Sequence, residues 1–255
     1  MIEAFGRTDV GRRRKVNEDS FLVAPEYHLY AVCDGMGGHN AGEVASRMAI
    51  ETLADFVERS ATEGEITWPF GLDANLSFDA NRLKTAVRLA NARVFQAADD
   101  REEYTGMGTT VVAALVAGDV MTLCSAGDSR CYLVRGGELR QLTRDDSWVS
   151  AALGEGILNS DDVERHPLRN VITKAVGARE SIDLETVEHT LQPGDVALLC
   201  SDGLHGMVGD DAISRLLVPV PDSLEEAAAR LVEAANEAGG RDNVTVVLLR
   251  YEGRS

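Results

Sequence analysis

The sequence predicts an α+β domain in which helices lie over antiparallel β-sheets. Many short runs are rich in β-branched residues and are bounded by Gly, Asp or Asn, which is typical of strands. Two pairs of these runs are separated by only two residues, Gly118 with Asp119 and Gly136 with Gly137, as in β-hairpins. Consecutive hairpins favour antiparallel sheets over βαβ crossovers, and the longer amphipathic segments between them favour covering helices.

The predicted strands extend from near the N-terminus to the end of the chain. The first expected hairpin joins residues 109–117 to 120–126, and the second joins 130–135 to 138–142. The remaining predicted strands are residues 20–24, 28–33, 196–200 and 243–251.

Three longer segments carry apolar residues at intervals of three or four, which is the spacing of one helical face. They are residues 41–58, 80–98 and 223–238. The third segment opens with a capping box formed by Ser223 and Glu226 and is followed by two glycines, so both of its ends are defined by the sequence.

The domain organisation is simple, because no repeat, low-complexity tract or Pro/Ser-rich linker interrupts the chain. We therefore expect one domain over residues 4–251. Residues 145–170 are charged, irregular and longer than an ordinary connection, so they are a candidate functional flap. The N-terminus lacks the apolar segment of a signal peptide, and no apolar run is long enough to span a bilayer. These features predict a cytoplasmic location and no membrane contact.

The four cysteines are Cys33, Cys124, Cys131 and Cys200, and none belongs to a C-x-x-C pair. We interpret them as small buried hydrophobic residues in a reducing compartment. A cysteine-dependent phosphatase is disfavoured, because no cysteine is followed by the C-x-x-x-x-x-R loop that would cradle an anion.

The chain is strongly acidic, with 42 acidic and 25 basic side chains and a formal net charge of −17. Such a field repels nucleic acid and anionic membranes, so neither is expected as a partner. The acidic excess serves either solubility alone or the convergence of some carboxylates on cations, and net charge does not distinguish these readings.

The positions of certain aspartates favour convergence. A single aspartate at a strand end is usually a turn former, but several stand beside apolar strand-like runs and next to Gly, Ser or Asn. Converging carboxylates repel one another and resist burial, so they stay ionised together only if cations neutralise them. The five aspartates in such positions are Asp19, Asp34, Asp128, Asp202 and Asp242.

The ligand type indicates which metal would bind. Carboxylate sites without nearby His or Cys favour Mg²⁺, Mn²⁺ or Ca²⁺ over zinc or copper. Gly35 follows Asp34, and the absence of a Cβ there would let a backbone carbonyl approach an ion. Two such ions about 4 Å apart activate a bridging water for in-line attack on phosphorus and neutralise the phosphoryl oxygens.

Arg14 is the candidate for holding a substrate phosphate, because a guanidinium matches phosphate in a bidentate geometry. The alternative is that residues 12–15 are simply a solvated basic run. The position of Arg14, five residues before Asp19, favours the phosphate-binding role.

A series of short motifs along the chain resembles that of a known family. The ordered motifs are GRRRKVNEDSF, AVCDGMGGHNAGEVAS, GTT, AGDSRCYLVRGG, LTRDDSWV, VITKAVG, LLCSDGL and GGRDNVTVVLL. Each motif alone is weak, but in this order they resemble the metal-dependent protein phosphatases of type 2C, in particular the compact bacterial members. The resemblance covers residues 4 to 251 and implies a four-layer α-β-β-α sandwich of two antiparallel sheets flanked by helices.

The resemblance also implies a role for each site residue. It implies that Asp34 bridges two core metal ions, with the Gly35 carbonyl on the first, and that Asp202 and Asp242 bind the second. Asp128 is similar to the ligand of a third, weaker ion. The remaining implied residues are Arg14 for phosphate, Glu18 and Asp19 as acids that position metal-bound water, and Asn243 as support beside Asp242.

The sequence departs from the family pattern at three places. Met36 stands where many relatives have a histidine assigned as the general acid, and whether nearby His39 or a metal-bound water replaces that acid stays open. Asp146 replaces the histidine of the L-T-x-D-H-S segment, and Lys174 stands where arginine is common. The second departure bears on the flap and on the local pKa values, not on the core metals.

The function implied is that of an Mn²⁺- or Mg²⁺-dependent protein serine/threonine phosphatase. It would hydrolyse phosphoserine and phosphothreonine by attack of a metal-bridging water, and it would oppose a Ser/Thr protein kinase. The expected partners are phosphorylated proteins, including that kinase and its substrates, and the expected state is a monomer. Two alternatives remain, a partner-switching phosphatase acting on a phosphorylated anti-sigma antagonist and a metal-free binding pseudophosphatase.

Overall fold

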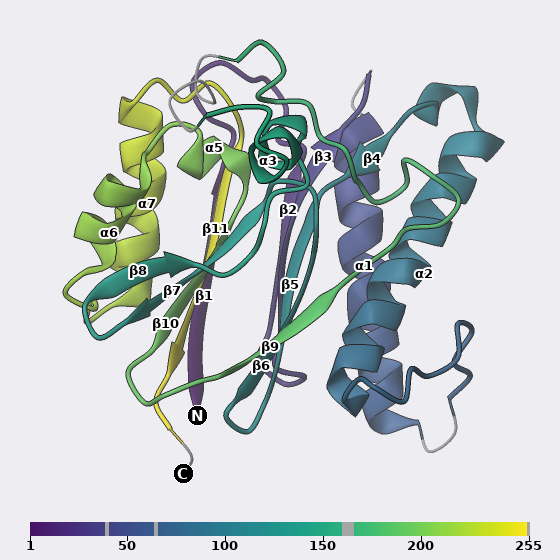
Figure 1. The fold of residues 1–255 in the computed structure, drawn as a ribbon, viewed down its shortest axis with the longest axis horizontal. Coiled ribbons are helices and arrows are strands. Elements are labelled where there is room, and N and C mark those ends of the chain that lie inside the picture. The colour runs from purple at the N-terminus through teal and green to yellow at the C-terminus, as the bar shows by residue number, and fades with distance from the viewer. Residues whose placement is uncertain (39–40, 64–65, 160–165, 254–255) are drawn as a thin grey trace.

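The computed structural model describes residues 1–38, 41–63, 66–159 and 166–253. It confirms the predicted four-layer sandwich, which Figure 1 shows with its layers side by side. Helices α1 (Ala41–Thr62) and α2 (Phe78–Asp100) form one outer layer, and α6 (Asp210–Leu217) and α7 (Leu224–Glu237) form the other. Two antiparallel sheets lie between these layers in the described part of the chain.

The first sheet lies beside α6 and α7 and has the strand order β1-β11-β10-β7-β8. Its neighbouring strands are antiparallel throughout. The strands are β1 (Ile2–Asp9), β11 (Val244–Tyr251), β10 (Val196–Cys200), β7 (Arg130–Arg135) and β8 (Glu138–Gln141).

The second sheet lies beside α1 and α2 and has the order β2-β3-β5-β6-β9, with β4 pairing to β3. It too is antiparallel. The strands are β2 (Asp19–Ala24), β3 (Leu29–Met36), β4 (Gly108–Thr109), β5 (Val111–Ala117), β6 (Val120–Ala126) and β9 (Thr186–Thr190).

Both predicted hairpins are present with two-residue loops. Ala117 pairs with Val120 at the end of the β5–β6 hairpin, and Arg135 pairs with Glu138 at the end of β7–β8. The glycines of the second loop have φ angles of 60° and 86°, a left-handed conformation that costs glycine little.

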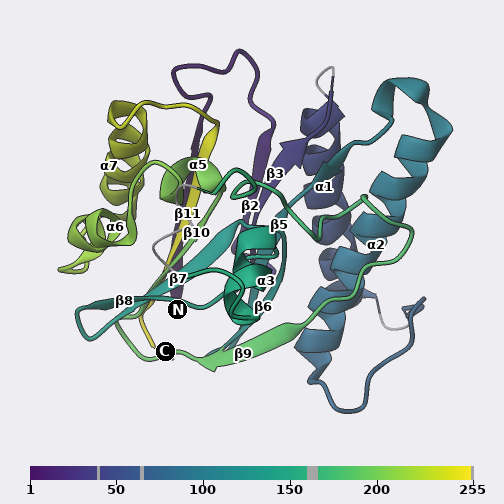
Figure 2. The same cartoon turned by 45° about the horizontal axis from the view of Figure 1, so that its top comes forward.

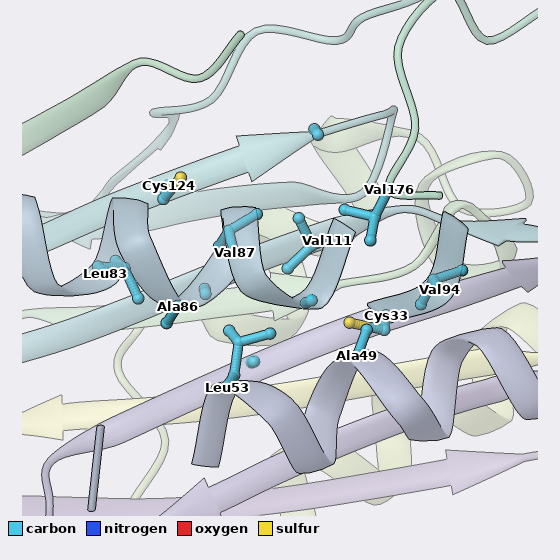
Figure 3. Packing of buried hydrophobic residues seen from close by; sticks show 14 of the residues in the cluster. Cys33, Ala49, Leu53, Leu83, Ala86, Val87, Val94, Val111, Cys124 and Val176 are labelled. Atoms are coloured by element: carbon cyan, nitrogen blue, oxygen red, sulfur yellow. The ribbon is translucent and has the colours of Figure 1, made fainter. Parts of the chain in front are cut away.

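Apolar side chains fill the spaces between all four layers. One cluster lies between α1, α2 and the second sheet, another between the two sheets, and a third under α6 and α7. Figure 3 shows Leu53 of α1, Val87 of α2 and Val111 of β5 gathering in the first of these clusters. The four cysteines are free and buried, as predicted.

The described part of the chain also contains short helices outside the four layers. They are η1 (Glu102–Tyr104), α3 (Trp148–Gly154) and α5 (Asp202–His205). Helix α3 lies inside the segment predicted as an irregular flap, which corrects that expectation; residues 160–165 of the flap are outside the described part of the chain. Among the helices that are described, none has the length and apolar character needed to cross a membrane.

The structure contains strands that the sequence pattern did not predict. Strand β1 is a sheet edge in which most side chains keep some solvent contact, and β9 is an edge whose side chains are mostly exposed. Neither strand has the clean apolar alternation of a half-buried strand, because an edge strand is held by backbone pairing on one side only. Helix α6 was also missed; its eight residues are too few to show a helical period clearly.

Candidate metal centre

All five aspartates singled out in the sequence lie at the same end of the sandwich, where strands of both sheets begin or end. This is the end opposite the chain termini in Figure 1. The charge of Asp34 interacts with those of the other four, so the structure brings these distant positions together. Asp19 begins β2, Asp34 lies near the end of β3, Asp128 and Asp202 follow β6 and β10, and Asp242 precedes β11.

Asp19 is the most deeply buried of these acids, with 7% of its surface exposed. It lies directly opposite Asp34 in the register of β2 and β3. Its Oδ2 accepts hydrogen bonds from Ser201 Oγ (2.8 Å) and Thr245 Oγ1 (2.7 Å), whereas its buried Oδ1 has no partner among the described residues. Burial raises the pKa of Asp19 to about 6, although the two hydroxyl groups act in the opposite direction.

The backbone of Asp34 is fixed from both sides. Its N–H donates to Thr110 Oγ1 (2.9 Å), and its carbonyl accepts from Thr109 Oγ1 (2.8 Å) and from the Thr110 N–H (2.8 Å). Burial raises the pKa of the Asp34 carboxyl well above its usual value, and the neighbouring acids, Asp19 first, raise it further. A carboxylate in this position stays charged only if a cation offsets the repulsion.

Asp202 occupies the first position of helix α5 and is held close to the chain that leads into β11. A Cβ on Gly203 would lie 1.8 Å from the Asn243 carbonyl oxygen, so this close approach requires glycine. Burial, followed by the charges of Asp242 and Asp19, raises the pKa of Asp202 to about 6.

Asp128 lies in the turn between β6 and β7 and is 9% exposed. Its carbonyl accepts a hydrogen bond from His205 Nε2 (2.9 Å), which ties the turn to α5. Its side-chain Oδ1 is buried and lacks a partner among the residues described. Burial, then the charges of Asp202 and Asp145, raises the pKa of Asp128 to about 7.

Asp242 differs from the other four acids because it has a basic partner. Arg14 Nη2 lies 2.7 Å from Asp242 Oδ2, and the two side chains are 48% and 35% exposed. The same hydrogen bond is the main reason that the pKa of Arg14 is raised. The structure therefore places the predicted phosphate-binding arginine at the solvent edge of the acid cluster.

Asn243 holds the loop between β1 and β2 against the start of β11. Its Nδ2 donates to the carbonyls of Val10 and Val16, both at 3.0 Å. Its Oδ1 accepts from the N–H of Glu18 at 2.8 Å. These bonds fix the backbone on either side of Arg14.

Gly35 and Glu18 meet at the start of α1. The Gly35 N–H donates to the Glu18 carbonyl (3.1 Å), and a Cβ on Gly35 would lie 2.0 Å from the Gly42 carbonyl oxygen. The backbone packs too tightly here for any other residue, so glycine is needed for packing as well as for access to its carbonyl. Burial raises the pKa of Glu18, and the charge of Arg14 opposes this shift.

Two of the departures from the family pattern contact each other. Lys174 Nζ lies 3.0 Å from Asp146 Oδ1, forming an ion pair at the base of the flap. The Asp146 backbone N–H also donates to the Gly127 carbonyl (2.8 Å), and its carbonyl accepts from the Thr173 N–H (2.8 Å). Asp146 thus connects the flap to the turn that carries Asp128.

The donor set fits a hard divalent cation. Two buried carboxylate oxygens, Asp19 Oδ1 and Asp128 Oδ1, lack hydrogen-bond partners. Within the described ranges, no Lys, Arg or His side chain lies within ion-pair distance of Asp19, Asp34, Asp128 or Asp202. Nor do these ranges contain three or more His, Cys, Asp or Glu side chains arranged to hold an ion by themselves.

Several residues that contribute to the site were not found from the sequence. Ser201 and Thr245 hold Asp19, and His205 holds the backbone of Asp128. Ser201 directly precedes Asp202, so its position beside a candidate ligand was a usable signal. Thr245 and His205 had no such signal. His39, considered as a general acid, lies outside the described residues.

The known proteins that this chain is similar to are protein phosphatases. The protein phosphatase 2C family matches residues 10–239. The serine/threonine phosphatase stp of Listeria monocytogenes is 37% identical over 253 residues, covering 96% of this chain and 94% of that protein. The structure of the Mycobacterium tuberculosis serine/threonine phosphatase PstP/Ppp has a TM-score of 0.85 and 37% identity, with 98% of this chain and 99% of that chain covered.

A further structure is directly relevant to the predicted cofactor. The catalytic domain of PstP in complex with two manganese ions has a TM-score of 0.82 and 36% identity, covering 98% of this chain and 97% of that one. The extent of the family match and of the sequence identity is decisive for the classification. This chain belongs to the protein phosphatase 2C family, and its predicted enzyme class, a phosphoprotein phosphatase, is confirmed.

Proposed function

We propose that this chain is an Mn²⁺- or Mg²⁺-dependent protein phosphatase that hydrolyses phosphoserine and phosphothreonine. The observation that carries the proposal is the convergence of five buried or half-buried aspartates, of which only Asp242 has a basic partner; divalent cations would neutralise the others. The names of the related Listeria and Mycobacterium phosphatases support the choice of phosphorylated serine and threonine as substrates.

The aspartates around Asp34 would hold the ions. Asp34 lies opposite Asp19 in the register of β2 and β3, and the charges of Asp19 and Asp202 both raise its pKa, so Asp34 would hold both core ions. Asp202 and Asp242 would bind the second ion, and the Gly35 carbonyl the first. Asp128 would bind a third, weaker ion. When bound, the ions would neutralise phosphoryl oxygens and activate a water for in-line attack on phosphorus.

Arg14 would hold the substrate phosphate. Its guanidinium is half-exposed and engages Asp242 through one nitrogen, which leaves further N–H donors for a phosphate oxygen. The backbone bonds made by Asn243 keep the loop of Arg14 in place, so the guanidinium is presented at the mouth of the acid cluster.

Glu18 and Asp19 would position the attacking water. Asp19 is suited to this role because Ser201 and Thr245 fix one carboxylate oxygen and leave the other unpaired. The carboxylate therefore has one oriented acceptor available for a water proton.

We also propose that the enzyme acts as a monomer on phosphorylated proteins and opposes a Ser/Thr protein kinase. This partnership follows from the chemistry, because a phosphoserine or phosphothreonine substrate is the product of such a kinase. The acidic net charge of −17 supports a protein substrate over nucleic acid.

The test is phosphate release from a phosphothreonine peptide, titrated with Mn²⁺ and with Mg²⁺. We expect activity to depend on metal, to be abolished by EDTA and to return when metal is restored. Full activity in chelator would refute the proposal. Replacement of Arg14 by alanine should raise KM for the peptide and leave the melting temperature nearly unchanged. An unchanged KM would remove Arg14 from the phosphate-binding role.

A further inference from the structure

Four exposed basic residues stand next to Arg14 or Asp242 in the chain, and the proposed function assigns none of them a role. Three flank Arg14 in the loop between β1 and β2, and the fourth precedes Asp242 in the loop between α7 and β11. We call them the basic rim: Arg12, Arg13, Lys15 and Arg241.

The two loops that carry the basic rim are held together by specific bonds. The N–H groups of Arg12 and Arg13 both donate to the Gly240 carbonyl, at 2.8 and 3.1 Å. A Cβ on Gly240 would lie 2.6 Å from Arg12 Cγ, so the loops are in close contact. Figure 2 shows these loops side by side at the end of the sandwich that carries the aspartates.

The charges of the basic rim are not used within the described part of the chain. Many exposed arginines elsewhere are paired with acids, for example Arg59 with Glu63 and Arg93 with Glu51. No such ion pair involves a basic-rim residue in the ranges that are described, although the protein carries an acidic excess of 17 charges. Unneutralised cations concentrated at one position of an acidic protein create a local attraction for anions.

We propose that the basic rim binds carboxylates next to the phosphorylated residue, so the preferred substrates are phosphoproteins with acidic flanking sequences. This inference rests on the proposed function. The overall acidic field would repel such a segment, and the basic rim offsets that repulsion where the substrate enters. A short acidic segment needs only a local patch, whereas nucleic acid or an anionic membrane would meet the field of the whole molecule.

The test compares two phosphothreonine peptides that differ only in their flanks, Asp and Glu in one and Asn and Gln in the other. In the wild-type enzyme with Mn²⁺, kcat/KM should be about tenfold higher for the acidic peptide, because several exposed ion pairs each contribute a small factor. The quadruple variant R12Q/R13Q/K15Q/R241Q should lose this preference through a higher KM. Added salt should reduce it in the wild type.

A matched control separates the basic rim from the change in net charge. The variant R59Q/R93Q/R140Q/R230Q removes an equal number of positive charges, four, from exposed positions on α1, α2, β8 and α7. It should keep the preference for the acidic peptide. Hydrolysis of p-nitrophenyl phosphate, which has no flanks, should be equal in wild type and both variants. Equal rates on this small substrate also establish that the variants are folded.

The outcomes distinguish this inference from the proposed function. If the wild type does not release phosphate from p-nitrophenyl phosphate with Mn²⁺, the proposed function fails and this inference fails with it. If the wild type hydrolyses both peptides equally, or the basic-rim variant keeps the preference, only the basic-rim inference is overturned. Binding to phosphatidylserine vesicles that depends on the basic rim, with no peptide preference, would likewise overturn it in favour of a membrane partner.

Discussion

The two ends of strand β10 carry aspartates in opposite electrostatic settings, one buried and one half-buried. Asp195 precedes the strand, is 3% exposed, and accepts hydrogen bonds from Arg135 Nε on one oxygen and from Arg135 Nη2 and the Gln192 N–H on the other. Asp202 follows the strand and faces other acids, whose charges help to raise its pKa. The same sheet therefore ends in a satisfied ion pair at one side and in a cluster of like charges at the other.

This difference separates a structural acid from a functional one. A buried carboxylate normally requires a basic partner or a full set of donors, and Asp195 has both. Asp19 has two hydroxyl donors and a buried oxygen without a partner, and Asp34 is surrounded by acids. An arrangement of that kind lowers the stability of the metal-free protein and is useful only when cations bind there.

The sharpest test of this comparison is to replace one acid at the functional end. Asp34→Asn should lower turnover of p-nitrophenyl phosphate about 10³-fold or more, because metal-supplied charge stabilisation of several kcal/mol is lost. The unfolding free energy in EDTA should stay equal or rise, since one repelling charge is removed. Full activity would contradict the assignment, and a large loss of stability in EDTA would make Asp34 a structural residue.

Metal binding should stabilise the functional end in a measurable way without any substrate. At free Mn²⁺ about 100 times its Kd, the folded state should gain about 2.7 kcal/mol, which raises the melting temperature in calorimetry. The Asp34→Asn and Asp202→Asn variants should show a much smaller rise, and an equal concentration of NaCl serves as the control. The same rise in wild type and both variants would place the bound metal elsewhere.

Replacement of Asp195, at the other end of β10, should affect stability and not activity. Asp195→Asn should lower the unfolding free energy by about 1–3 kcal/mol, because charged hydrogen bonds to Arg135 and to the Gln192 N–H are weakened. Its kcat at a temperature below unfolding should match that of the wild type. A variant with normal stability and reduced kcat would invert the distinction between the two ends.

The smallest effect is expected at the base of the flap, where acids and bases are paired but partly exposed. Lys174→Met removes the ion pair with Asp146, whose side chains are 35% and 24% exposed, so the global loss should be below about 1 kcal/mol. Limited proteolysis should instead show faster cleavage within residues 145–170. Lys174→Arg keeps the charge and should restore resistance, and equal cleavage of all three proteins would rule out an anchoring role.

The amino-acid sequence by itself determined the layers of the fold and the residue types of the candidate site. Hairpin loops, capping residues and apolar periods are local patterns, so the β5–β6 and β7–β8 hairpins and the long helices could be predicted from neighbouring residues. The placement of aspartates at strand ends was equally local, and strands of antiparallel sheets bring such ends to a common edge.

Only the tertiary structure decided which residues are partners at long range. Edge strands β1 and β9 exist because a neighbouring strand supplies their hydrogen bonds, and their own side chains carry no clear pattern. Ser201 and Thr245 meet Asp19, and Lys174 meets Asp146, across long separations along the chain. No periodicity or spacing in the sequence predicts such contacts. They depend on how whole sheets pack, and not on which residues are neighbours in the sequence.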